Sequence, residues 1–167
     1  MAIIKPNNNT ISAITALPSG MVSAPGLTTG KVLQHQFDSD TSLISFSNTS
    51  FVDTNLSIDF TPTSASSQIL TFGFIQLYHD GGSSSHGQTA IKVISGGSQV
   101  GEDITTLIGY GGNEAFWSGM IGFSVREAAS DTSQRTIKVQ VRNASSGATA
   151  SYNQYGGLST LNIMEIA

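Results

Sequence analysis

Residues 135–142, RTIKVQVR, alternate strictly between apolar and polar side chains. Ile137, Val139 and Val141 fall on one side of an extended chain, and Lys138 and Gln140 fall on the other. A period of two residues is typical of a β-strand that buries one face and exposes the other. This stretch therefore predicts a strand lying over a hydrophobic core.

Runs of the same kind follow one another from residue 31 to the end of the chain, with turn clusters such as Asp80-Gly81-Gly82-Ser83 between them. Residues 68–78, QILTFGFIQLY, are apolar on both faces, as expected of a central strand covered on both sides. No window combines helical periodicity with helix caps. We therefore predict an all-β chain, an antiparallel β-sandwich of the jelly-roll type with eight or nine strands. The predicted strands are 31–37, 43–46, 56–60, 68–78, 90–94, 104–108, 116–126, 135–142 and 158–166.

Residues 1–30 differ from the rest of the chain. They hold three of the four prolines and an Asn7-Asn8-Asn9 run, which excludes a regular strand or helix. They are nevertheless too apolar for a solvated tail. We interpret residues 1–30 as an irregular N-terminal anchoring arm and residues 31–167 as the β-sandwich domain. The apolar residues that we expect to anchor the arm are Ile3, Ile4, Ile11, Ile14 and Leu17.

The composition excludes several classes of function. Only 11% of the 167 residues are charged, and the net charge is −4, so a nucleic-acid partner is not expected. The chain has no cysteine, which rules out thiol catalysis and cysteine metal sites. No apolar run approaches 18 residues, so we expect no membrane insertion. With 25 Ser and 17 Thr and few charged residues, the polar surface must be built from Ser, Thr, Asn and Gln rather than from charge.

Candidate catalytic and metal-binding residues are few. His79-Asp80 and His86 could hold a metal ion, but two solvated histidines, one at a strand end and one in a loop, explain them better. His35 is the remaining histidine. There is no G-x-S-x-G turn to present a nucleophile. We therefore predict no enzymatic activity, no catalytic or metal-binding residues and no cofactor.

Aromatic residues near two predicted turns are the candidate binding residues. Tyr110, Phe116 and Trp117 flank Gly111-Gly112-Asn113, and Tyr152 and Tyr155 flank Asn153-Gln154. Flat aromatic faces beside amides and hydroxyls suit a sugar. Aromatic residues are also favoured at subunit interfaces and at the rim of a core. The sequence leaves glycan contact and subunit contact both open.

Several segments of the chain resemble short virion proteins of bacteriophages, in particular tail-fibre-like proteins of marine and cyanobacterial phages. The resemblance lies in residues 30–34 (GKVLQ), 49–58 (TSFVDTNLSI), 60–70 (FTPTSASSQIL) and 159–166 (STLNIMEI), and in residues 4–18 of the arm. It is weak over residues 80–130. Gln68 stands where these proteins often have lysine.

The resemblance implies a β-sandwich, a homotrimer and a place on the surface of the phage particle, and it transfers no catalytic residue. A tail fibre or receptor-binding tip for host attachment is then the first interpretation. A capsid decoration protein that stabilises the shell is the second, and a soluble carbohydrate-binding module is the third. The expected partners are further copies of this chain, a tail or major capsid protein, and a host surface glycan.

Overall fold

The computed structural model describes residues 30–47, 49–80, 87–108, 116–144 and 149–167. The chain divides into two units, Met1–Lys31 and Val32–Ala167. The arm residues Ile3, Ile4, Ile11, Ile14 and Leu17 lie outside the described residues, so the anchoring arm stays a prediction. No helix in the described part of the chain is long and apolar enough to cross a bilayer.

The unit Val32–Ala167 is an antiparallel β-sandwich, as predicted. Ten strands are described, one more than the larger predicted number. Their bounds are β1 Val32–Asp40, β2 Ile44–Phe46, β3 Val52–Phe60, β4 Gln68–Asp80, β5 Gly87–Ser95, β6 Ser98–Ile108, β7 Phe116–Ala128, β8 Arg135–Asn143, β9 Thr149–Tyr152 and β10 Ser159–Ile166.

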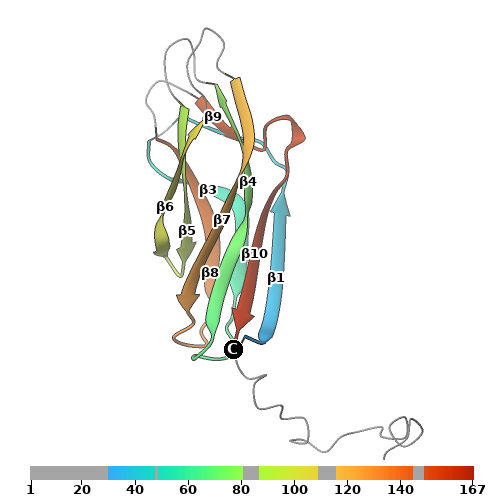
Figure 1. Ribbon diagram of the computed structural model, residues 1–167, viewed down its shortest axis with the longest axis vertical. Helices are drawn as coiled ribbons and strands as arrows, with labels where there is room; N and C mark the ends of the chain where they lie inside the picture. Colours follow the sequence, from blue (N-terminus) through green and yellow to red (C-terminus); the bar gives the residue numbers. More distant parts are fainter. Residues whose placement is uncertain (1–29, 48, 81–86, 109–115, 145–148) are drawn as a thin grey trace, which may run out of the picture. The chain divides into compact units, whose positions relative to one another are not determined.

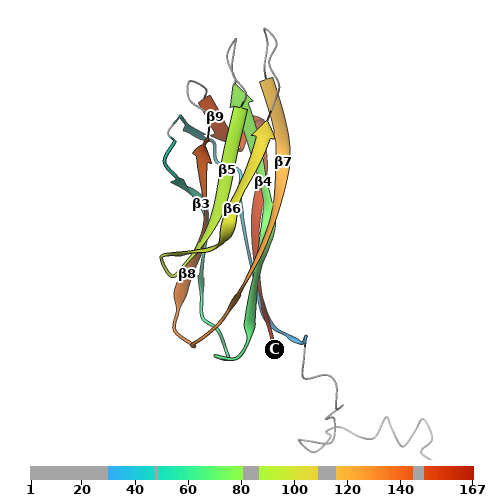
Figure 2. The same cartoon turned by 60° about the vertical axis from the view of Figure 1, so that its left-hand side comes forward.

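The strands form two sheets. In the first, β4 lies in the centre, with β7 along one edge and β10 followed by β9 along the other. β1 then pairs with β10, and β2 pairs with β9. The second sheet has the order β3-β8-β5-β6. Figure 1 looks onto the first sheet, and Figure 2 shows the two layers from another side.

The pairing of strands is that of a jelly roll. β1 pairs with β10, β3 with β8, β4 with β7 and β5 with β6, so the first half of the chain pairs with the second half in reverse order. This is one long hairpin rolled into two four-stranded sheets, in which β1 and β2 share one strand position and β9 and β10 share another. The strand missed from the sequence is β9, because four residues next to turn residues give too short a pattern.

The core lies between the two sheets. Alternate residues of β8 face inward, as the RTIKVQVR pattern predicts, and they belong to the same core cluster as Ile69, Ile75 and Leu77 of β4. The fully buried aliphatic residues of the core include Ile69, Ile75, Leu77, Ile137, Val139, Val141, Leu161 and Ile163.

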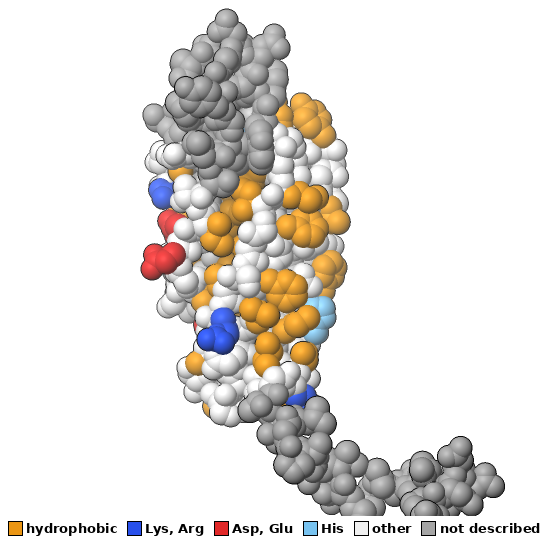
Figure 3. Space-filling view, in the orientation of Figure 1, with side chains coloured by type: hydrophobic (Ala, Val, Ile, Leu, Met, Phe, Trp, Pro, Cys, Tyr) orange, Lys and Arg blue, Asp and Glu red, His pale blue; other side chains and the backbone are white. Residues whose placement is uncertain are grey.

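The prediction that β4 is covered on both faces is only half right. Its inner face is buried, but Leu70, Phe72 and Phe74 on its outer face stay partly exposed. Figure 3 shows hydrophobic side chains gathered over this side of the molecule. Among the described residues, the second sheet covers the inner face of β4, and no further layer covers its outer face.

Candidate functional surface

Glu165 on β10 is a fully buried carboxylate. It accepts hydrogen bonds from the backbone N–H groups of Thr63 and Ser64 at 2.9 and 3.0 Å and from the Ser67 hydroxyl at 2.6 Å. The Thr63 hydroxyl and the Gln34 amide donate two more, at 3.0 and 2.7 Å.

Burial alone would raise the pKa of Glu165, but the hydrogen bonds led by those from Ser67 and the Thr63 N–H outweigh it and lower the pKa to about 2. The carboxylate is therefore ionised at neutral pH and held by neutral donors. Its contacts tie the loop after β3 to the last strand, which is a structural task.

Tyr152 on β9 is fully buried, and the expectation that it contacts a glycan or another subunit is wrong for this residue. Its position pairs with Leu77 on β4, so the ring points to the inner face of the sheet and joins the core. Burial, and then the negative charge of Asp40, raise the pKa of the phenol above its usual range. This side chain is a core residue with a polar end.

Tyr155 is the exposed aromatic residue of the turn between β9 and β10. Its side chain is 81% exposed, and its ring meets Tyr78 edge to face with the ring centroids 5.5 Å apart. Tyr155 has φ 57°, and Asn153 before it has φ 55°, so both lie in the left-handed region. These dihedral angles turn the chain out of the sheet and present the Tyr155 ring to solvent.

The other three predicted aromatic residues are only partly placed. Tyr110 lies outside the described residues. Phe116 and Trp117 are described in backbone alone, where they pair with Asp80 and His79 at the end of β4. Their backbone thus lies at the end of the first sheet where β9 also pairs with β4.

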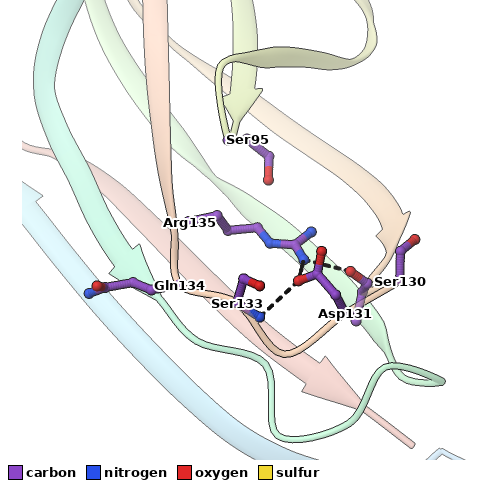
Figure 4. A pocket seen from close by; sticks show the side chains of 8 residues that line it. Ser95, Ser130, Asp131, Ser133, Gln134 and Arg135 are labelled. Carbon is purple, nitrogen blue, oxygen red and sulfur yellow. Dashed lines mark hydrogen bonds and ion pairs between the residues drawn. The ribbon is translucent and has the colours of Figure 1, made fainter.

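A pocket of about 270 Å³ lies between the β5–β6 hairpin and the loop from β7 to β8 (Figure 4). Arg135 donates from one Nη2 to Asp131 Oδ1 at 2.8 Å and to the Ala129 carbonyl at 2.6 Å. The Ser133 N–H, and then the charge of Arg135, lower the pKa of Asp131. Asp131 and Arg135 are therefore paired with each other, and their bonds hold the loop from β7 to β8 in place.

The histidines do not form a metal site with one another in the described structure. His35 lies on β1 and contacts Asn162 Oδ1 through Nε2 at 3.1 Å. His79 is buried on the inner face of β4, so the prediction of a solvated strand-end histidine is wrong for it. His86 lies outside the described residues, and those residues include no group of three His, Asp or Glu suited to a metal ion.

The sequence analysis missed Glu165 and the pocket at Arg135. The signal for Glu165 was present, because it shares the period-two face of Leu161 and Ile163 in β10. An acid on a buried face needs donors from elsewhere in the chain. The pocket had only the local Asp131–Arg135 spacing as a signal, and this spacing is common.

No protein-family model matches the chain, and no curated protein matches its sequence. The resemblance to phage tail-fibre-like proteins thus has no support from either comparison.

Solved structures include three similar ones. The C-terminal domain of EclA, a sugar-binding protein, has a TM-score of 0.39 at 10% identity and covers 95% of this chain and 99% of that one. A structure of the Gx strain of infectious bursal disease virus has 0.38 at 13% identity, covering 80% and 40%. The VP2 subviral particle of that virus has 0.37 at 13% identity, covering 81% and 39%. Likenesses at this level carry no argument about function.

Proposed function

We propose that this chain is a non-enzymatic structural protein of a bacteriophage particle, displayed at the particle surface as a homotrimer. In this proposal the β-sandwich faces outward as a tail fibre or receptor-binding tip, and residues 1–30 anchor it. A capsid decoration protein with the same anchoring arm is the alternative placement.

One observation carries the proposal. Two segments that resemble phage virion proteins, residues 60–70 and 159–166, are about 100 positions apart in the sequence but meet at Glu165. Thr63, Ser64 and Ser67 of the first segment donate to the acid of the second. A protein that folds in this way needs both segments, because the donors of the first hold the acid of the second. The two resemblances therefore support a single shared fold rather than two separate chance matches.

The use of charged groups supports a structural role. Glu165 holds a loop, Asp131 pairs with Arg135, and Lys138 pairs with Asp53 at 2.7 Å. Each of these groups is engaged by a neighbour in a way that supports the fold. This arrangement suits a protein whose task is to persist on a particle.

The anchoring role is tested by replacing Ile3, Ile4, Ile11, Ile14 and Leu17 together with serine. We expect incorporation into particles to fall at least tenfold, because the arm then loses its apolar contacts. The matched control replaces Asn7, Asn8 and Asn9 with serine and should incorporate as the parent chain does. Normal incorporation of the apolar-to-serine variant would reject the anchoring role.

The placement is tested by electron cryo-microscopy of particles that carry this chain. Density for the sandwich at the tail would support the fibre or receptor-binding role, and density on the capsid shell would support the decoration role. Absence of the chain from particles would reject the virion proposal as a whole.

A glycan-binding role is the second candidate, and the exposure of Tyr155 favours it. Aromatic faces bind the apolar face of a sugar ring, and Tyr78 braces the Tyr155 ring from one side. Glycan-array binding by the chain should be lost in Tyr155→Ala and kept in Leu158→Ala, a matched change in the same turn. Equal binding by both variants would reject Tyr155 as the contact.

A further inference from the structure

The outer faces of the two sheets differ in charge. On the outer face of the second sheet, β3, β8, β5 and β6 carry many charged side chains, namely Asp53, Asp59, Lys92, Asp103, Lys138 and Arg142. Among the side chains described on the outer face of the first sheet, Arg126 is the one with a formal charge. The chain therefore presents one charged side and one nearly uncharged side.

The uncharged side is also apolar. Phe37 is 58% exposed and Met120 is 62% exposed, although they lie on opposite edges of this sheet. Between them lie partly exposed apolar residues of β4 and β10. We define the apolar face as Phe37, Leu70, Phe72, Phe74, Met120 and Met164, and Figure 3 shows it as orange side chains with few charged ones among them.

Phe51, just before β3 of the second sheet, is covered by cationic side chains of the same chain. The Phe51 ring has Lys92 Nζ at 4.2 Å and the Arg142 guanidinium at 4.9 Å from its centroid. These long side chains shield the ring within the same chain. Among the described residues no such cation lies over Phe37 or Phe72, so a cover for the apolar face has to come from beyond the described residues.

The outer face of the first sheet, which contains the apolar face, is large enough for a stable interface. β4 has 13 residues, which at about 3.3 Å per residue gives a length of roughly 40 Å. Four strand positions at about 4.8 Å give a width of roughly 20 Å. The product, about 800 Å², is the area that each partner buries in a specific protein interface of standard size.

We propose that a second copy of this chain covers the apolar face. A second copy suits it because a nearly uncharged face meets no like charge when copies associate, and because contiguous exposed apolar patches mark interaction sites. The inference rests on the proposed homotrimer and assigns the surface through which its subunits pack.

The test is the mass of the full chain in solution, measured by sedimentation at micromolar concentration. The parent chain should show a multiple of 17.4 kDa. Phe37→Lys and Met120→Lys should each weaken association at least tenfold, because association would bury an unpaired charge. Thr105→Lys, an exposed position on the outer face of the second sheet, is the matched control and should associate as the parent does.

Ser124→Lys guards against a folding defect, because Ser124 is an exposed polar residue beside Phe72 on the same face. It should also weaken association while the circular dichroism spectrum stays that of the parent chain. An oligomer that persists in all three face variants would overturn the apolar face as the interface and leave the homotrimer standing. A monomeric parent chain would overturn the inference together with the homotrimer, while placement on particles is tested separately.

Discussion

Glu165 is a residue whose charge is buried without a cation beside it. Five donors from Gln34, Thr63, Ser64 and Ser67 surround it, and they favour its ionised form. Hydrogen bonds to a charged group are stronger than those between neutral groups, so this cluster contributes to stability at neutral pH. Four of the five donors come from the loop after β3.

The cluster predicts acid sensitivity. The pKa of Glu165 falls from 4.5 to about 2 on folding, so its contribution is fully present above pH 4.5. That contribution is lost as the pH falls from 4.5 towards 2, and its full size is about 3 kcal/mol. Urea unfolding across this pH range should show the loss in the parent chain.

Glu165→Gln removes the titrating group. It should lower the free energy of unfolding by about 2 kcal/mol at pH 7, because an amide leaves several donors poorly satisfied. Its stability should then change much less between pH 4.5 and 2. Glu102→Gln, at an exposed position, is the control, and an equal acid response in Glu165→Gln would contradict the assignment.

Gly73 in the middle of β4 has no room for a side chain. A Cβ there would collide with the carbonyl oxygen of Thr160 and touch the Phe123 ring. We expect Gly73→Ala to lower the free energy of unfolding by roughly 2–4 kcal/mol, since the backbone of β10 would have to move. Gly122→Ala on β7 is the matched control, because its Cβ would meet its nearest neighbour at 3.9 Å. Equal stability of the two variants in urea unfolding would contradict this close approach.

At the scale of elements, the break between β9 and β10 shapes one edge of the first sheet. Asn153 N–H donates to the Gln76 carbonyl at 3.1 Å, and Ser159 Oγ donates to Asn153 Oδ1 at 2.6 Å. Asn153 Nδ2 donates to the Asp40 carbonyl at 2.7 Å. These bonds fix Asn153, at the end of β9, to β4, β1 and β10. The turn between β9 and β10 then carries Tyr155 outward.

Two substitutions separate the roles of Asn153. Asn153→Gly keeps the left-handed backbone easily and loses the side-chain bonds, so it should cost roughly 1–3 kcal/mol of unfolding free energy. Asn153→Ala should cost about 1 kcal/mol more, because alanine is strained at φ 55°. Thermal and urea unfolding measure both. An alanine variant as stable as the glycine variant would show that the left-handed conformation is not required.

At the scale of the whole molecule, the core belongs to the unit Val32–Ala167. All the residues of its buried cluster lie between Phe46 and Ile163. A chain that starts at Val32 therefore retains the complete described core. We therefore expect that residues 1–31 can be removed without preventing the sandwich from folding.

We expect removal of residues 1–31 to change the midpoint of thermal unfolding by less than about 3 °C, the shift that roughly 1 kcal/mol produces in a domain of this size. Removal of residues 1–36 is the control. It deletes half of β1 and the Gln34 donor to Glu165, and it should lower the midpoint clearly. A large loss on removing only residues 1–31 would mean that the arm supports the sandwich.

The sequence by itself determined the class of the fold, the inward and outward faces of β8 and the central position of β4. Alternation of side chains is a local property, and a strand that buries one face must show it. The same alternation in β10 places Glu165 on the buried face. Its role follows only from the hydrogen-bond donors around it, which come from distant parts of the chain. Tyr155 was named as a candidate from the sequence, and the structure shows its side chain exposed.

The tertiary structure alone decided which distant residues meet. It placed Tyr152 and His79 in the core and joined residues 60–70 to Glu165. It also put six charged side chains on the outer face of the second sheet, against one, Arg126, among those described on the outer face of the first. A period of two tells which side chains share a face, but not which face another layer covers. Covering depends on how the hairpin rolls up, and this is set by contacts between residues far apart in the chain.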